Sequence, residues 1–452
     1  MPFRDIIIVG IVIGAIPYIL RRPWIGILMW AWISYMAPHR LCWSFAYDFP
    51  VAAITAGALF LGMVLNREPG RMPRSAVLWP WALFVLWTCI TLATALNPDG
   101  AFTYWTRFIK GQGLTLCMML LITNRVRLEA FLLVVAMSIG FYGVKGAVFA
   151  IGTGFESRVW GPPDSAIDGN NEIALALLMV MPLLRYFQVF TPKKLHKNVY
   201  LGTMAFSLVS ALSTYSRGAL LAMGMMTASL VWKSKRRAAM LLLVVAAVPI
   251  AVSLMPDKWF DRMNTIHTYQ EDSSAMGRIN AWYFAWNLAK DRPLTGGGMR
   301  TFTKLLFYKY APNPLDHHDA HSIYFQVLAE QGFPGLVFFL LTIFMGYRLC
   351  SAIMKRTEGI PEVAWANELS RMIQVSLLAY LTGGAFLGLA YFDLPYHLIA
   401  VAVIANGLVE RQLARPAGAP PLPEPGLYDY KALEDSAPPW QTAPVRRAQR
   451  GA

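Results

Sequence analysis

The feature that most constrains this chain is a succession of long apolar runs with few polar stretches between them. A helix that crosses the hydrocarbon core of a bilayer needs about 20 mostly apolar residues, and thirteen runs approach that length. They lie at 5–20, 24–37, 50–65, 76–96, 111–124, 128–151, 171–189, 199–215, 218–233, 237–255, 334–353, 370–391 and 395–412. Only 15% of the 452 residues are charged, against about 25% in a typical soluble domain. The sequence therefore predicts an all-α, polytopic membrane protein.

The distribution of basic residues predicts the orientation of these runs. A net charge of +14 would raise nucleic-acid binding in a soluble protein, but here the basic residues sit in short clusters between apolar runs, as the positive-inside rule describes. No nucleic-acid role is therefore expected. The clusters at 67–74, 125–127, 193–197, 233–237 and 355–356 occupy alternate connections, which we take as cytoplasmic. We expect about 12 crossings with both termini inside, the first run being retained rather than cleaved as a signal peptide.

This topology divides the chain into four parts. Residues 1–255 form an N-terminal transmembrane bundle, 256–333 a long external loop, 334–412 the C-terminal transmembrane helices and 413–452 a disordered cytoplasmic tail rich in Pro, Ala and Arg. The cysteines lie in or beside apolar runs without CxxC spacing, so neither a disulfide framework nor a zinc site is expected. They are Cys42, Cys89, Cys117 and Cys350.

The external loop contains two predicted helices, and the first is amphipathic. It begins near Ser273 and Ser274, which are good N-caps, and ends at the Gly296–Gly298 break. An aromatic stripe recurs at helical spacing, formed by Ile279, Trp282, Tyr283 and Trp286. Such a stripe can lie in the headgroup region of a membrane or pack on other helices, and the spacing favours neither.

The second helix of the loop carries the leading catalytic candidate. Asp319 is the predicted N-cap and Gly332 the predicted end, which places His321 in the first turn. The positive end of the helix dipole disfavours an imidazolium there, and a neutral imidazole suits a general base. The neighbouring His317 and His318 also allow a metal interpretation. We favour no metal, because His317 and His321 would share a helix face only if the helix began before its cap.

Two arginines occupy positions that suit an anionic leaving group. Arg217 begins an apolar run on the outer side and Arg278 opens the amphipathic helix. Either guanidinium could merely extend to lipid headgroups, but at an outer interface near a neutral histidine they also suit a diphosphate. A predicted external loop adds four polar residues, Arg158, Asn170, Asn171 and Glu172. Capping of the helix that follows would by itself explain Glu172.

Four segments resemble the O-antigen ligase and polymerase superfamily of bacterial envelope glycan assembly. They are SRGA around Arg217, GRINAW…DRPLTGGG over 277–298, HSIYFQVLAEQGFPGLVFF from His321 and RVWGPPDSAIDGNNEIALAL before the run at 171. The resemblance covers about residues 70–410. The N-terminal stretch LRRPWIGILMWAWISYMAPHRLCWSFAY further resembles a proteobacterial subgroup of O-glycosylation ligases associated with exosortase systems.

The resemblance implies a GT-C-like glycosyltransferase of the inner membrane with a periplasmic active site. The donor would be a glycan on undecaprenyl diphosphate, the acceptor a sugar hydroxyl of lipid A–core, and no metal or nucleotide cofactor would be needed. His321 would deprotonate the acceptor, while Arg217 and Arg278 would hold the diphosphate. Further donor or acceptor contacts would come from Arg158, Asn171 and His318. Ser322 departs from the pattern, since many relatives have Asn after the histidine.

Two alternatives remain open from the sequence. A superfamily relative could use another acceptor, as a protein O-glycosylation ligase or an O-antigen or exopolysaccharide polymerase does. A transporter or flippase for a lipid-linked glycan would place polar groups near the bilayer midplane, often within repeats. Lys145 is a candidate deep charge but lies close to the end of its run, and no repeat is visible.

Overall fold

The computed structural model describes residues 3–66, 72–234, 236–253, 255–264, 273–414 and 426–428, and every regular element in them is helical. The longer elements are α1 (Phe3–Arg21), α2 (Trp24–Met36), α3 (Val51–Asn66), α4 (Leu78–Ala93), α5 (Pro98–Leu121), α6 (Arg125–Gly152), α7 (Asn170–Phe190), α8 (Lys194–Leu212), α9 (Arg217–Lys233), α10 (Arg237–Ser253), α11 (Asp257–Asn264), α12 (Ser273–Asp291), α13 (Lys304–Tyr310), α14 (Ile323–Arg356), α15 (Ala364–Gly384) and α16 (Asp393–Leu413). Two short 3-10 turns, η1 (Pro38–Leu41) and η2 (Pro361–Val363), complete the set.

The predicted all-helical class is confirmed, and each of the thirteen apolar runs coincides with a helix. By length and composition α1, α6, α7 and α14 can each cross a membrane, and α2, α3 and α4 are shorter apolar helices. The number of crossings stays a prediction. The run at 111–124 is only the second half of a helix, because α5 begins at Pro98 behind an Asn97 cap. The charged residues of its first half conceal that part from a hydropathy pattern.

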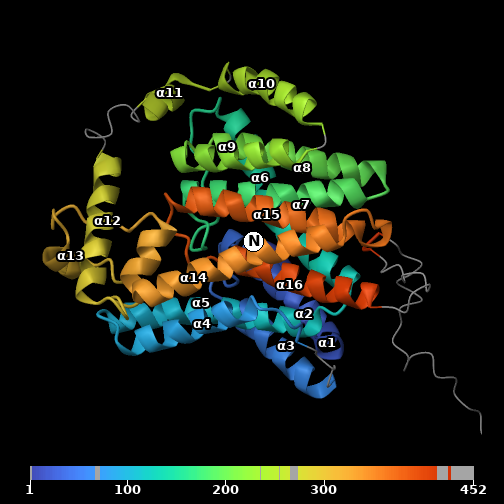
Figure 1. The fold of residues 1–452 in the computed structure, drawn as a ribbon, viewed down its shortest axis with the longest axis horizontal. Helices are drawn as coiled ribbons and strands as arrows, with labels where there is room; N and C mark the ends of the chain where they lie inside the picture. The colour runs from blue at the N-terminus through green and yellow to red at the C-terminus, as the bar shows by residue number, and fades with distance from the viewer. Residues whose placement is uncertain are drawn as a thin grey trace, which may run out of the picture.

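Two helices form the centre of the bundle. α7 packs against α6, α8, α9 and α15, and its residues from Ile173 to Val180 are fully buried. α16 is likewise buried from Leu394 to Ala405 and packs on α5, α6, α14 and α15. A helix that is apolar on all sides is expected at such a central position. The main helices run side by side along the long axis of the molecule (Figure 1).

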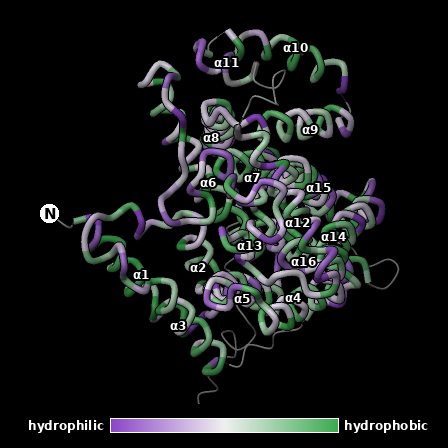
Figure 2. The backbone as a smooth tube through the Cα atoms, turned by 90° about the vertical axis from the view of Figure 1, so that its left-hand side faces the viewer, coloured by the Kyte–Doolittle hydropathy of each residue, from purple (hydrophilic) through white to green (hydrophobic). Residues whose placement is uncertain are grey.

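At the periphery, α1 and α3 pack on each other and project from the side of the bundle (Figure 2). α1 exposes several large apolar side chains, among them Ile6, Ile11 and Tyr18. Figure 2 shows mainly hydrophobic colour along both helices. Such exposed apolar surface fits helices that face lipid.

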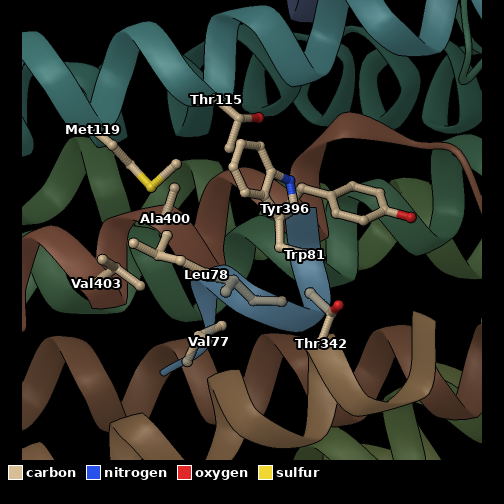
Figure 3. Close-up of a pocket in the computed structure, with 10 residues that line it drawn as sticks. Val77, Leu78, Trp81, Thr115, Met119, Thr342, Tyr396, Ala400 and Val403 are labelled. Carbon is tan, nitrogen blue, oxygen red and sulfur yellow. The ribbon is translucent and has the colours of Figure 1, made fainter. Parts of the chain in front are cut away.

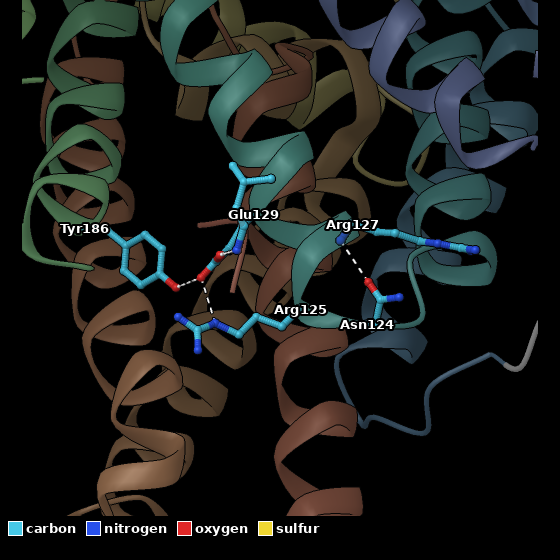
Figure 4. A network of polar contacts seen from close by, with 6 residues as sticks. Asn124, Arg125, Arg127, Glu129 and Tyr186 are labelled. Atoms are coloured by element: carbon cyan, nitrogen blue, oxygen red, sulfur yellow. Dashed lines mark hydrogen bonds and ion pairs between the residues drawn. The ribbon is translucent and has the colours of Figure 1, made fainter. Parts of the chain in front are cut away.

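The end of the bundle at which α6 begins is fixed by a buried carboxylate. Glu129 Oε1 accepts hydrogen bonds from Arg125 Nε (2.8 Å) and Tyr186 Oη (2.5 Å), while Asn124 caps the helix (Figure 4). Its Oε2 accepts the backbone N–H of Leu427 at 2.6 Å. One short piece of the tail thus contacts the bundle. The rest of the tail, for which disorder was predicted, lies outside the described residues. Arg67, Arg71 and Lys235 of the basic clusters also lie outside them.

The opposite end is covered by the predicted loop helices. α12 runs across the end of the bundle, roughly perpendicular to the main helices, with α13 beside it (Figure 1). A separate core of rings joins the two, in which Phe284 stacks on Phe307 at 4.5 Å and contacts Phe302 at 5.0 Å. Within the aromatic stripe, Trp282 stacks on Phe325 and Trp286 contacts Phe333 edge-on, both on α14, while Tyr283 is exposed. A place for the stripe in the headgroup region stays a prediction.

A break in α14 attaches these helices to the bundle. Gly332 has φ 67° and ψ −172°, which interrupts α14 where the sequence predicts a helix end, and Pro334 lacks an N–H. The carbonyls of Ala329 and Glu330 accept instead from Gly297 N (2.8 Å) and Gly298 N (3.0 Å). Phe333 N in turn donates to Pro293 O at 2.9 Å. The glycine turn after α12 is therefore hydrogen-bonded to the break.

We predict that Gly332→Ala lowers stability by about 1–3 kcal/mol, because this backbone conformation is almost exclusive to glycine. An added Cβ would also lie 2.3 Å from Leu294 O. The measurement is the thermal unfolding midpoint of the purified protein in detergent. Gly202→Ala on α8 is the matched control, since nothing lies within 4 Å of its Cβ position. An unchanged midpoint for Gly332→Ala would contradict this account of the break.

Candidate active site

His321 lies in the segment between α13 and α14, at the end of the bundle covered by α12. Its φ of 41° is in the left-handed region, where non-glycine residues are uncommon. α14 begins at Ile323 with Ser322 as N-cap, so the predicted Asp319 cap and the place of His321 in the first turn are both wrong. The left-handed residue prevents an earlier start, and Asp319 instead lies 3.9 Å from the Arg300 guanidinium.

The segment that carries His321 is held by the GRINAW residues of α12. Asn280 Nδ2 donates to the carbonyls of Asn313 (2.8 Å) and Asp316 (2.9 Å), and its Oδ1 accepts from Asn313 N at 2.9 Å. Trp282 Nε1 donates to Ala320 O at 2.8 Å, next to His321. Strained backbone persists only where its surroundings determine it, and these bonds supply that support.

Burial is the main cause that lowers the pKa of His321 below its ordinary value of 6.5. The nearby positive charge of Arg278 lowers this pKa further, and Asp319 opposes the shift. The expectation of a neutral ring thus agrees with the direction of the pKa shift, but its main cause is burial, not the expected helix dipole. A neutral imidazole can accept a proton at pH 7.

The two neighbouring histidines have other partners. His318 Nε2 lies 2.8 Å from Asp316 Oδ1, and its ring packs so closely on Gly277 that an added Cβ there would lie 2.3 Å from it. His317 Nε2 lies 3.1 Å from the carbonyl oxygen of Phe302. Among the described residues no group of three or more His, Cys, Asp or Glu side chains could hold a metal ion. The expectation of a site without metal stays a prediction.

Arg217 and Arg158 belong to a neighbouring part of the same end. Arg217 is the first residue of α9. Asn170 Nδ2 donates to Thr214 O at 2.8 Å, which ties the start of α7 to the turn before α9. The Arg158 guanidinium lies over the Tyr215 ring, 5.8 Å from its centre. Both arginines therefore lie beside the start of α7.

Glu172 connects this part to His321. It lies in the first turn of α7, directly after Asn171, and it interacts electrostatically with Arg278 and Asp168. Arg278 also interacts with His321. Arg278 thus interacts electrostatically with both Glu172 and His321, although capping of α7 had appeared sufficient to explain Glu172.

Arg300 is a site residue that the sequence pattern did not reveal. Its guanidinium lies 3.9 Å from Asp319 Oδ1, and its Cζ is 4.1 Å from the centre of the Tyr104 ring on α5. The only local signal is its position directly after the glycine turn. The contact with Tyr104 spans almost two hundred residues, so spacing could not predict it.

A pocket elsewhere in the bundle lies between α4, α5, α14 and α16 (Figure 3). It is lined by Val77, Leu78, Trp81, Thr115, Met119, Thr342, Tyr396, Ile399, Ala400 and Val403. No carboxylate, imidazole or cation lines it, so it offers no acid–base group for catalysis.

Residues 202–340 match the family model described as O-antigen ligase. This match supports membership of the O-antigen ligase-like superfamily. The matched segment contains Arg217, Arg278 and His321 and extends across the break in α14. Residues 3–191 match a family of unknown function (DUF5935). No curated protein matches the chain.

The match to the O-antigen ligase family suggests an enzyme of the membrane glycosyltransferase type, and with the apolar helices it suggests a multi-pass membrane protein. The substrates of this family are, in general, a lipid-linked glycan and a lipid acceptor. The candidate residues lie at the end of the bundle that α12 covers.

We predict that Arg278→Gln raises the pKa of His321, because the positive charge of Arg278 lowers this pKa in the wild type. Asp319→Asn should lower the same pKa, because the negative charge of Asp319 raises it. Diethyl pyrocarbonate modifies the neutral ring, so the pH dependence of His321 modification, followed by mass spectrometry, reports the pKa. The midpoint should move to higher pH in the first variant and to lower pH in the second. Lys290→Gln, an exposed cation of α12, is the control. Shifts of the same sign in both variants would refute the electrostatic account.

Proposed function

We propose that this protein is an O-antigen ligase-type glycosyltransferase. It moves a glycan from undecaprenyl diphosphate to a sugar hydroxyl of lipid A–core at the periplasmic face of the bacterial inner membrane. The observation that carries the proposal is the half-buried His321, held by α12 and within electrostatic range of Arg278, inside the segment that matches the O-antigen ligase family. A base and a cation at one place are what transfer from a diphosphate donor requires.

In the proposed reaction, His321 accepts the proton of the acceptor hydroxyl as its oxygen attacks the anomeric carbon of the donor glycan. The bond between that carbon and the diphosphate oxygen breaks, and undecaprenyl diphosphate leaves with the electron pair. Arg217 and Arg278 neutralise the charge that develops on the leaving group, a role suited to guanidinium groups. Arg158, Asn171 and His318 surround this arrangement as further substrate contacts, and neither metal nor nucleotide takes part.

A second candidate retains the same chemistry with another acceptor. The N-terminal match is to a family of unknown function, and α1 to α3 lie outside the segment that matches the ligase family. A protein hydroxyl or a growing polysaccharide would then replace lipid A–core. Substituting these acceptors one at a time in the same transfer assay separates the two candidates.

We predict that His321→Ala abolishes transfer by the purified, reconstituted protein while donor binding is retained, because the base is lost but the arginines remain. Product formation is measured with undecaprenyl-diphosphate glycan and lipid A–core in the presence of EDTA, and donor binding is measured separately. His317→Ala serves as control because that ring contacts Phe302 O instead. Undiminished transfer by a folded His321→Ala protein would exclude the histidine as base.

We predict that Arg217→Lys also loses most of the transfer activity, since an ammonium cannot make the bidentate contact of a guanidinium with a phosphate. A rate lowered by a factor of ten or more is expected in the same assay. A variant as active as the wild type would show that Arg217 is no more than an interfacial cation.

A further inference from the structure

α5 carries two exposed positive charges near its middle, Arg107 and Lys110. Arg107 and Lys110 follow the helix start at Pro98 by nine and twelve residues, or about 13 and 18 Å along the axis. Both side chains are exposed, and among the described residues neither has a carboxylate within 4 Å. Two neighbouring exposed cations without a carboxylate partner can attract an anionic ligand.

These two cations continue a line that starts at Arg300. The Cζ atoms of Arg300 and Arg107 lie 4.1 and 5.6 Å from the centre of the same Tyr104 ring. Tyr104, Arg107 and Lys110 are spaced three residues apart, so each is a neighbour of the next on the surface of α5. We name Arg300, Arg107 and Lys110 the cationic line.

Arg300, the first member of the cationic line, has its backbone fixed by hydrogen bonds and its guanidinium near the segment that carries His321. Arg300 has φ 58°, unusual for a residue other than glycine. Its N–H donates to Glu330 Oε1 at 2.8 Å, and its carbonyl accepts from Asn97 Nδ2 at 3.1 Å. Its guanidinium lies 3.9 Å from Asp319, two residues before His321. The backbone is therefore fixed so that this side chain lies between α5 and the His321 segment.

α5 and α9 lie on different sides of the bundle, so we assign them to different substrates. α9, which begins with Arg217, packs on α15 and α7, whereas α5 packs on α4 and α16. α14 contacts both α15 and α4 and separates the two groups (Figure 1). In a direct displacement the attacking hydroxyl approaches opposite the leaving group. If Arg217 holds the leaving diphosphate, the acceptor arrives from the side of α5.

We propose that the cationic line binds phosphate groups of the lipid acceptor, a phosphorylated glycolipid that enters along the exposed face of α5. The proposal rests on the proposed function, in which Arg217 and Arg278 hold the donor. Guanidinium groups bind phosphate in bidentate fashion, and Lys110 adds a point charge deeper along the helix. Arg300 then positions the acceptor hydroxyl near His321.

The test compares the Arg107→Gln/Lys110→Gln double variant with the wild type in lipid nanodiscs. Binding of lipid A–core, with its phosphate groups intact or enzymatically removed, is measured without donor, so the result does not depend on turnover. Donor binding is measured separately. Lys194→Gln/Lys197→Gln is the charge-matched control, because both lysines are exposed on α8 at the other end of the bundle.

The expected result is a rise of at least about tenfold in the Kd for the phosphorylated acceptor, with unchanged binding of the donor and of the dephosphorylated acceptor. Arg107→Lys/Lys110→Arg, which keeps both charges, should retain most of the affinity and shows that the positions tolerate substitution. Unchanged acceptor binding, a loss confined to the donor, or an equal loss in the control would each overturn the proposal. Wild-type protein that binds the acceptor in this way but transfers nothing would refute the proposed function alone.

Discussion

The arrangement of the site depends on the interruption of α14 at Gly332. A continuous helix would use the carbonyls of Ala329 and Glu330 internally, and the glycine turn after α12 would have no backbone partners on the bundle. The left-handed glycine and the following proline free these carbonyls, and Gly297 and Gly298 donate to them. A few backbone hydrogen bonds thus attach the covering helices to the bundle, where unsatisfied polar groups would be costly.

This attachment gives His321 its surroundings. α12 supplies both the residues that hold its segment, Asn280 and Trp282, and the cation that interacts with it, Arg278. Burial and the positive charge act in the same direction on the imidazole, and both favour the neutral ring. One helix therefore contributes to the shape and to the electrostatics of the site, which explains why the GRINAW and HSIYF segments occur together in the resemblance to the family.

The sequence predicts the parts of the structure that depend on local pattern. Hydropathy located the apolar helices, and Gly332 was correctly expected to interrupt a helix. The first loop helix was expected to reach the Gly296–Gly298 turn, but α12 ends earlier, at Asp291 before Pro293. Local preference failed at Asp319, because a good N-cap residue was taken into a contact with Arg300 and the helix began after a left-handed His321 instead. The hydropathy pattern also missed the first half of α5, because the charged residues there lower the mean hydropathy of that segment. Contacts between distant segments, such as Arg300 with Tyr104, have no local signature.

The most direct test of the account is the stereochemistry of transfer by the reconstituted wild-type protein. The product formed from undecaprenyl-diphosphate glycan and lipid A–core is isolated, and the configuration of the transferred anomeric carbon is determined by NMR. A hydroxyl activated by His321 that displaces the diphosphate in one step predicts inversion relative to the donor. Retention would require a covalent glycosyl-enzyme intermediate and would contradict the role assigned to His321.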